Sequence, residues 1–237
     1  GERASDAFLT RYGAMRKGLQ NRHAPKRRDL VGLLGSVANE KEAQHCRTLL
    51  KDFRVHVPKL EDARPHGGAL IRATVRAGAL SEALKLLSEH RELRFPPTLG
   101  STMLLVRQLG VAGRVDDALA AHGILAEASP DDGRVWSVGF LETLTRALLK
   151  GGEFTRAAKL FASFREKGCT PTVHLYRLAL GRSAEGCGEP DTSSDALAAV
   201  SVLEGGMKAD SVKDDVCDRL AAQAREAAEA ASQAAAG

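Results

Sequence analysis

GALIRATVRAGALSEALKLLSE, residues 68–89, is the stretch of sequence that decides the fold. Its second half places four apolar residues at the i, i+3, i+4 and i+7 spacing of an amphipathic helix: Leu80, Ala83, Leu84 and Leu87. Its first half is another apolar segment that ends at Gly78, and glycine is suited to close a helix in a left-handed conformation. The stretch therefore predicts two helices joined by a glycine turn.

The same arrangement recurs along the chain. In three places a Gly precedes an Ala by five positions: Gly78 and Ala83, Gly113 and Ala118, and Gly152 and Ala157. Ala43 upstream and Ala196 downstream are weaker counterparts, which gives spacings of 40, 35, 39 and 39 residues. The predicted second helices are followed by a proline that marks the link to the next pair: Pro97, Pro130 and Pro171. A period of this length is typical of stacked helical hairpins, which bury a continuous core only together.

We therefore predict an all-α protein, a right-handed α-solenoid of about five helix-turn-helix repeats with an Ala-rich C-terminal helix. The composition agrees, because 43% hydrophobic residues with only 4% aromatic residues favour helices over a sheet sandwich. The predicted repeats span residues 29–58, 66–98, 101–132, 138–172 and 174–209, and the closing helix runs from about Ser211 to Ala235. Glu40 and Arg47 fall at apolar positions of the first repeat, and the polar segment 186–194 predicts an extended loop in the last.

Charge divides the chain further, into a basic N-terminal arm (1–28), the solenoid (29–209) and an acidic, Ala-rich C-terminal helix and tail (210–237). Between Thr10 and Arg28 there are seven basic residues and no acid, and we call these seven the basic cluster: Arg11, Arg16, Lys17, Arg22, Lys26, Arg27 and Arg28. From Glu185 to Gly237, eleven acids accompany four bases. The basic cluster favours a polyanion such as RNA, although a solvated arm or an acidic protein partner would also account for it.

Residues 165–180, REKGCTPTVHLYRLAL, resemble the junction between two repeats of the pentatricopeptide repeat family. In that family a Gly, a Pro, a Val and a Tyr lead into the next first helix, and here they are Gly168, Pro171, Val173 and Tyr176. The resemblance covers about residues 29–209. Tetratricopeptide repeats are the nearest competitor, but they favour large aromatic residues in the first helix, which this chain does not show consistently.

The resemblance implies that a residue near the start of each first helix, together with the last residue of the repeat, reads one RNA base. Asn, Ser or Thr is usual at the first position, where this chain has Gly68, Met103, Glu142 and Arg177. Asn or Asp is usual at the second, where it has Thr98 and Thr172. These departures argue against base-by-base reading and leave contacts between basic residues and the RNA backbone.

We accordingly expect a non-catalytic scaffold that has RNA and protein subunits of a large complex as partners. The resemblance points to an organelle, a mitochondrion rather than a plastid, and to the mitochondrial ribosome as the host. Two alternatives stay open: a protein scaffold or assembly subunit of a membrane energy-conversion complex without RNA, and an organellar RNA-processing factor. We expect no cofactor, no small-molecule substrate and no membrane span, since no apolar run approaches about 18 residues.

Residues that could carry chemistry are scattered. The four cysteines form no CxxC pair, which predicts free structural thiols: Cys46, Cys169, Cys187 and Cys217. No close set of four His or Cys ligands suggests a zinc site. The acid pairs 116–117, 131–132 and 214–215 lie near predicted helix starts, where caps are expected rather than catalytic acids. We predict that Trp136 packs in the core rather than stacking on a base.

Overall fold

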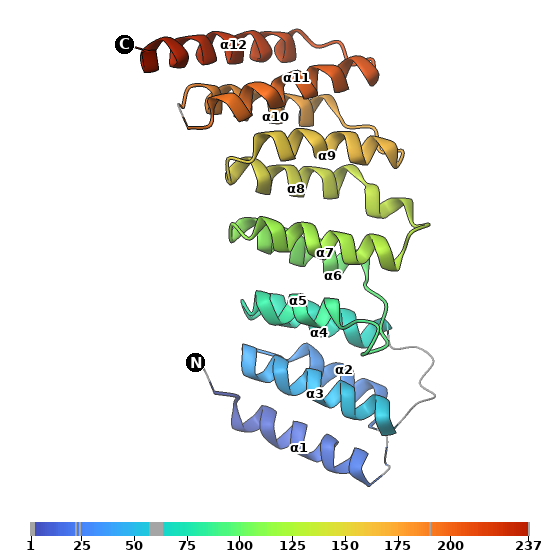
Figure 1. Cartoon of the computed structure of the whole chain (residues 1–237). Coiled ribbons are helices and arrows are strands. Elements are labelled where there is room, and N and C mark those ends of the chain that lie inside the picture. The colour runs from blue at the N-terminus through green and yellow to red at the C-terminus, as the bar shows by residue number, and fades with distance from the viewer. Residues whose placement is uncertain (1–2, 22, 24, 57–63, 190, 237) are drawn as a thin grey trace. The chain divides into compact units, whose positions relative to one another are not determined.

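The structure is a computed structural model that describes residues 3–21, 23, 25–56, 64–189 and 191–236. Within these residues the chain is 77% helical and has no β-strand, which confirms the all-α prediction (Figure 1). The chain forms two compact units, Gly1–Leu109 with Asp116–Pro130, and Gly110–Val115 with Asp131–Gly237. We describe each unit by itself.

The first unit contains α1 (Asp6–Gln20), α2 (Arg27–Gly35), α3 (Glu40–His56), α4 (Arg64–Arg76), α5 (Leu80–Ser88) and most of α6 (Leu99–Val111) and α7 (Val115–Ala128). The second unit contains the 3-10 helix η1 (Gly133–Trp136), α8 (Val138–Lys150), α9 (Phe154–Glu166), α10 (Val173–Cys187), α11 (Ser193–Ala209) and α12 (Asp215–Ala236).

Glycine turns join the paired helices where the sequence predicted them. Gly78, Gly113 and Gly152 have φ angles of 73°, 74° and 75°, the left-handed region in which other residues are strained. They follow α4, α6 and α8 and precede α5, α7 and α9, so each closes a first helix. The predicted glycine turn is therefore confirmed at all three positions.

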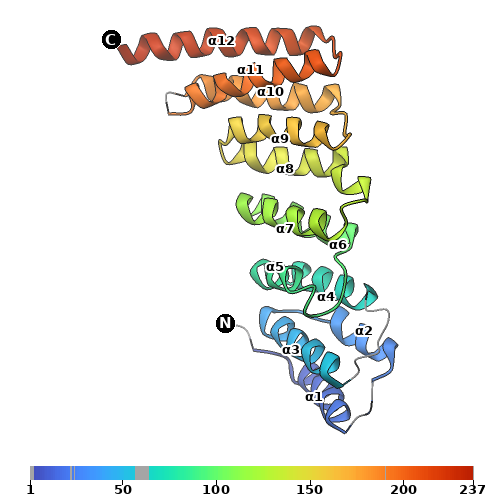
Figure 2. The ribbon, with the colours of Figure 1, turned by 45° about the vertical axis from the view of Figure 1, so that its right-hand side comes forward.

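The helices of the first unit lie in two layers. α2 packs beside α4, and α3 packs beside both α1 and α5 (Figures 1 and 2). Leucines of α2 and α3, among them Leu33, Leu34 and Leu49, are fully buried in the core. Because α1 packs beside α3, it belongs to the layer of second helices.

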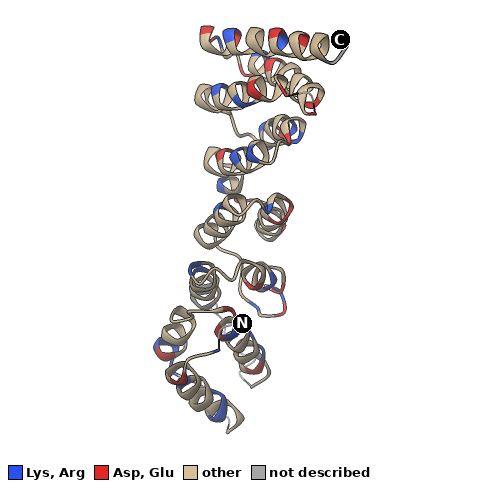
Figure 3. Ribbon diagram, turned by 90° about the vertical axis from the view of Figure 1, so that its left-hand side faces the viewer, with Lys and Arg blue, Asp and Glu red and all other residues tan. Residues whose placement is uncertain are grey.

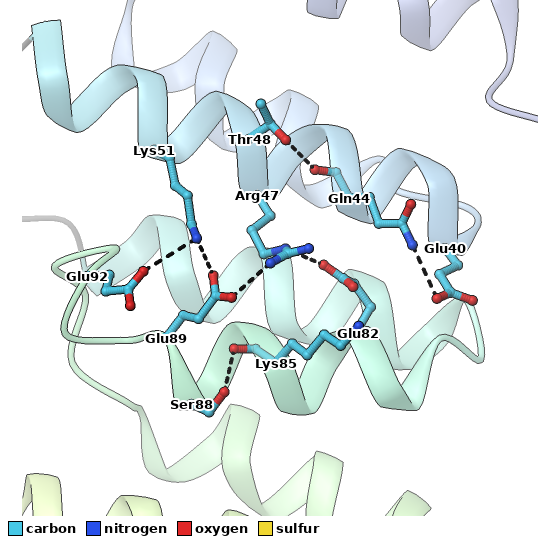
Figure 4. A network of polar contacts seen from close by, with 10 residues as sticks. All are labelled: Glu40, Gln44, Arg47, Thr48, Lys51, Glu82, Lys85, Ser88, Glu89 and Glu92. Carbon is cyan, nitrogen blue, oxygen red and sulfur yellow. Dashed lines mark hydrogen bonds and ion pairs between the residues drawn. The ribbon is translucent and has the colours of Figure 1, made fainter.

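A charged network joins α3 to α5 within that layer (Figure 4). Arg47 Nε lies 2.6 Å from a carboxylate oxygen of Glu82, whose side chain is fully buried, and Arg47 Nη1 lies 2.8 Å from Glu89. Lys51 Nζ also pairs with Glu89, at 2.9 Å. Burial alone would raise the pKa of Glu89, but the neighbouring Lys51 and Arg47 outweigh it and lower the pKa. Arg47 thus fills its expected apolar position as half of an ion pair.

The second unit has the same two-layer order. α10 packs beside α8 and α12, and α9 packs beside α11. Phe154, Phe161 and Phe164 of α9 are buried. Trp136, which is partly buried, meets Phe164 edge-on with ring centroids 5.1 Å apart, so it packs against α9. A Cβ atom at Gly186 would lie 2.4 Å from the Phe154 ring, so only glycine lets α10 approach α9 this closely.

Polar contacts with Tyr176 of α10 hold α11 in place. The buried Tyr176 hydroxyl donates to the Asp210 carboxylate at 2.5 Å, just after the end of α11. Arg165 of α9 donates to the carbonyl of Gly206 at 3.1 Å and lies 3.8 Å from Asp210. Burial and the hydrogen bond to Asp210 both raise the pKa of Tyr176. The three helices therefore share one partly buried polar cluster.

The structure corrects two expected boundaries in this unit. The predicted loop over 186–194 is shorter, because α10 continues to Cys187 and α11 begins at Ser193. The closing helix begins at Asp215 rather than near Ser211, which has a positive φ of 55°. Asp214 caps this helix by accepting a hydrogen bond from the backbone N–H of Cys217 at 2.9 Å.

Candidate nucleic-acid interface

The basic cluster lies on α1 and at the start of α2. Arg11, Arg16 and Lys17 are exposed on α1, and Lys26, Arg27 and Arg28 are exposed where α2 begins. Arg22, the seventh member, lies outside the described residues. Figure 3 marks the basic and acidic residues along these helices. The structure thus brings six predicted site residues onto two neighbouring helices that contact each other.

A buried carboxylate fixes the start of α1. Glu42 of α3 accepts hydrogen bonds from the Ser5 backbone N–H at 2.9 Å and hydroxyl at 3.0 Å, and from the Ala38 N–H at 2.9 Å. Burial alone would raise the pKa of Glu42, but these hydrogen bonds outweigh it and lower the pKa. Ser5 in turn caps α1 by accepting from the Phe8 N–H. The position of α1 is therefore set by α3.

Segment 1–28 was expected as an arm, yet most of it is a packed helix. Phe8, Tyr12 and Leu19 of α1 are buried, and the Tyr12 ring lies 4.9 Å from that of His45 on α3. A freely solvated arm would leave such aromatic residues in water, which is unfavourable. The cations of α1 are consequently presented on a fixed helical surface.

Most of the described cluster members have no internal partner. Arg16 pairs with Asp52 of α3, with 3.1 Å between Arg16 Nε and the carboxylate. Within the described residues, no side-chain hydrogen bond or ion pair involves the other five: Arg11, Lys17, Lys26, Arg27 and Arg28. Unpaired, exposed ammonium and guanidinium groups are those that exchange their counterions for the phosphates of a nucleic acid.

The start of α2 has an unusual arrangement of charge. Lys26 occupies the N-cap without a side-chain cap hydrogen bond, and Arg27 and Arg28 begin the helix. The helix dipole makes this end positive, so three cations here repel it, and Asp29 is the one acid of the first turn. Charges that oppose a helix dipole, as these do, are expected mainly at functional sites, where binding requires them. Together, the dipole and the cations favour an anion at this end.

Sequence reasoning missed three further cations of the first unit. Arg72 and Arg76 of α4 and Arg107 of α6 are exposed, and none forms an ion pair within the described residues. Neither α4 nor α6 contains an acidic residue. The signal available in the sequence was the i, i+4 spacing of Arg72 and Arg76 on a helix without acids. Because α2 packs beside α4, Arg72 and Arg76 are further exposed cations on a helix next to α2.

The expected base-reading positions of the first helices are occupied by internal contacts or lack a suitable group. A Cβ atom on the buried Gly68 would lie 3.4 Å from the Thr98 hydroxyl, which leaves little room beside it. Glu142 pairs with Arg146 one turn later at 2.7 Å. Arg177 pairs with Asp214 through two contacts, of 2.5 and 3.0 Å. Glu142 and Arg177 are therefore engaged within the chain, and Gly68 has no side chain to present to a base.

The expected positions at the ends of the repeats act as helix caps. Thr172 accepts a hydrogen bond from the Leu175 N–H at the start of α10. Thr98 accepts one from the Ser101 N–H and lies 2.7 Å from the Ser101 hydroxyl. Both hydroxyls satisfy N–H groups that a helix start would otherwise leave open. This capping role fits the observation that neither position has the Asn or Asp that base reading in the family uses.

The remaining chemical groups also have structural surroundings. All four cysteines are free and buried, and burial raises the pKa of the Cys46 thiol to about 12. Asp132 caps η1 by accepting from the Arg134 N–H, a capping role like that of Asp214. In the part of the chain that the structure describes, no group of three His, Cys, Asp or Glu residues could hold a metal ion. Over the same residues, no helix is both long and apolar enough to cross a membrane.

Compared with models of known protein families and with curated protein sequences, the chain matches none of either. The likeness to pentatricopeptide repeats accordingly rests on the residues quoted above, and the helices of the two units are consistent with a helical repeat.

Proposed function

We propose that this protein is a non-catalytic, pentatricopeptide-like scaffold that binds the backbone of RNA through the basic cluster. Its hairpins form a right-handed α-solenoid of about five repeats, and its other surfaces contact protein subunits of a large ribonucleoprotein. The family resemblance suggests an organelle and the mitochondrial ribosome as host.

One observation carries the proposal: apart from Arg16, the described cations of the basic cluster are exposed on a packed surface and have no ion pair or side-chain hydrogen bond within the described residues. A cation that is already neutralised by an acid gives little affinity for phosphate, because the ion pair must first be broken. Arg11, Lys17 and Arg27 carry no such cost. Arg72, Arg76 and Arg107 add the same character to neighbouring first helices.

The mode of binding is contact with phosphates, not reading of a sequence by a repeat code. The groups that a code would use are engaged within the chain, as in the pairing of Arg177 with Asp214. Phosphate contacts supply affinity and orientation but carry no base information. Binding of this kind depends strongly on salt. The logarithm of the binding constant falls linearly with the logarithm of the salt concentration, with a slope of about 0.7 to 0.9 times the number of phosphates neutralised.

A matched charge reversal tests the proposal. One variant changes Lys17, Lys26, Arg27 and Arg28 to Glu, and the control changes four exposed cations of the second unit to Glu: Lys159, Lys208, Lys213 and Arg219. Both variants alter the net charge equally. RNA affinity is measured by fluorescence anisotropy across a range of salt concentrations. We expect the first variant to lower the salt slope by about three and the control to leave it nearly unchanged.

Equal effects of the two reversals would mean that net charge, not the basic cluster, attracts RNA. A wild-type chain without salt-dependent RNA affinity would overturn the proposal and favour a scaffold that contacts only proteins. Native co-purification from the source cell distinguishes the hosts, since ribosomal RNA should migrate with the chain. Far-UV circular dichroism of each variant verifies that the helices are retained.

A further inference from the structure

A pocket opens within the basic cluster, between α1, the link that follows it and α2. Its volume is about 430 Å³, within the range of roughly 300 to 1,000 Å³ that small-molecule sites occupy. Its lining residues come from α1, namely Arg11, Ala14, Met15 and Gly18, and from the residues that follow, namely His23, Pro25 and Asp29. Neither the phosphate contacts nor the repeat pattern explains this cavity.

The pocket is held in shape by the way the chain returns after α1. The backbone N–H of His23 donates to the carbonyl of Gly18 at 2.8 Å, which brings His23 back against the last turn of α1. A Cβ atom at Gly18 would approach the His23 carbonyl to 3.4 Å, a close contact. His23 is exposed, and its position beside the last turn of α1 makes it part of the pocket lining.

The Arg11 guanidinium marks where an anion would lie. One of its terminal nitrogens lies 3.5 Å from the position that a Cβ atom on Gly32 would occupy, so the side chain reaches from α1 across to α2. Within the described residues it makes no hydrogen bond or ion pair. Its planar N–H groups suit a phosphate, which can accept two of them at once.

The rest of the wall suits a flat, partly apolar group. Met15 and Pro25 offer apolar surface, and a methionine sulfur makes favourable contacts with aromatic rings. The Asp29 carboxylate can only accept hydrogen bonds, so it favours a base with an amino group and repels phosphate. A phosphate is therefore expected at Arg11 and a base amino group at Asp29.

We propose that this pocket binds one unpaired nucleotide of RNA, with the base between Met15 and Pro25 and its phosphate at Arg11. The inference rests on the proposed RNA contact and adds a site to it, a pocket between α1 and α2 for a base that is not paired in a duplex. In a duplex the bases are stacked and paired, and only unstacked bases can enter a pocket of this kind. The basic cluster around the pocket then binds the flanking phosphates.

The test uses AMP, whose adenine carries an amino group, and follows the methyl signals of the chain by NMR. The protein has three methionines, so labelling the methyl groups with carbon-13 gives few signals, and Met15→Leu assigns the one at the pocket. We expect AMP to shift the Met15 signal to saturation and to leave those of Met103 and Met207 in place. Arg11→Gln should raise the dissociation constant for AMP about tenfold.

A matched pair of variants checks the location. Ala14→Phe fills the pocket and should abolish the AMP-induced shift, whereas Ala7→Phe, two turns earlier on the same face of α1, should not. Ala14→Phe should also remove the preference for single-stranded over double-stranded RNA while keeping salt-dependent binding. Retention of AMP binding by Ala14→Phe would overturn the inference.

Other outcomes separate this inference from the proposed function. A chain that binds RNA in a salt-dependent manner but shows no Met15 shift with AMP would overturn the pocket and keep the function. A chain that binds neither RNA nor AMP would overturn both. Inorganic phosphate or poly-glutamate that shifts Met15 as far as AMP, at equal concentration, would mean that the pocket recognises only negative charge, which excludes a base.

Discussion

Two arginines at the start of α2 and two arginines of α10 and α12 are chemically alike, but their surroundings differ. In the second unit, Arg177 is bound by Asp214 and Arg225 by Glu204, each with a contact of 2.5 Å. In the first unit, Arg27 and Arg28 are exposed without a partner in the described chain. Paired cations fasten neighbouring helices, and unpaired ones remain available to another molecule. The pairing, and not the number of basic residues, distinguishes a candidate interface from a structural contact.

The buried ion pair of α3 and α5 should give the largest effect on stability. Arg47→Ala leaves the fully buried Glu82 carboxylate without its cation, and we expect a loss of about 3 to 5 kcal/mol in the free energy of unfolding. Urea denaturation followed by far-UV circular dichroism measures it. Arg72→Ala removes an unpaired, exposed cation and should change the value by less than about 0.5 kcal/mol. Similar losses in both would refute the distinction.

Tyr176→Phe should have an intermediate effect. It removes the hydroxyl that donates to Asp210, a charged acceptor, and should lower the free energy of unfolding by about 2 kcal/mol. The fluorescence of Trp136, the sole tryptophan, reports on the second unit that contains this contact. The pKa of Tyr176 is raised in the folded state. The stabilisation that its hydroxyl gives the fold is therefore complete below the unfolded-state pKa of about 10, and it is lost as the pH rises through the folded-state pKa. The two proteins should therefore converge at alkaline pH, and a constant difference would contradict this account.

The half-exposed pair of Arg177 and Asp214 should matter less, and its effect should depend on pH. Hydrogen bonds from Arg177 and from the Cys217 N–H lower the pKa of Asp214. Its stabilisation is therefore present above the unfolded value of about 3.9 and is lost as the pH falls through the lower folded value. Asp214→Asn should be less stable than wild type at neutral pH and equal to it in strong acid, again by Trp136 fluorescence. Glu229→Gln, at an exposed acid on α12, should show no such convergence.

The start of α2 should give the smallest effect on stability. Changing Lys26, Arg27 and Arg28 to Ala removes cations from the positive end of a helix, so stability should stay the same or rise by up to about 1 kcal/mol. RNA binding should nevertheless weaken, with a salt slope lower by about two. A stability loss comparable to that of Tyr176→Phe would show that these residues are structural and would remove the contrast between the two groups of cations.

Much of the fold followed from local patterns. The positive φ angles of Gly78, Gly113 and Gly152 agree with the predicted turns, because glycine alone adopts this conformation without strain. The buried face of α9, which includes Phe154, Ala157 and Phe161, follows the predicted apolar spacing. On α5 the pattern was incomplete, since Glu82 is buried while Leu84 is only half-buried. Second helices have neighbours on two sides, so a single apolar stripe does not describe their burial.

For the candidate site, the sequence predicted which residues are basic but not how they are arranged in space. The sequence identified the basic cluster and showed that no acid lies between Thr10 and Arg28, because charge is a property of single residues. It did not indicate that α1 docks on α3 through Phe8, Tyr12 and Glu42, nor that Arg11 reaches toward α2 beside a pocket. It also missed Arg72, Arg76 and Arg107, whose importance depends on the absence of acids from α4 and α6 themselves.

The sequence by itself determined the helical hairpins, their glycine turns and the basic character of the N-terminal segment. These depend on backbone preference, on the 3.6-residue period and on charge, all of which act over a few residues. Only the tertiary structure decided which charges are neutralised. Arg47 meets Glu89 across 42 residues, and Arg177 meets Asp214 across 37, so each pair forms only when helices from successive repeats lie side by side. Within the described residues that packing gives Arg11 and Arg27 no ion pair, and a polyanion binds cations that are not already neutralised.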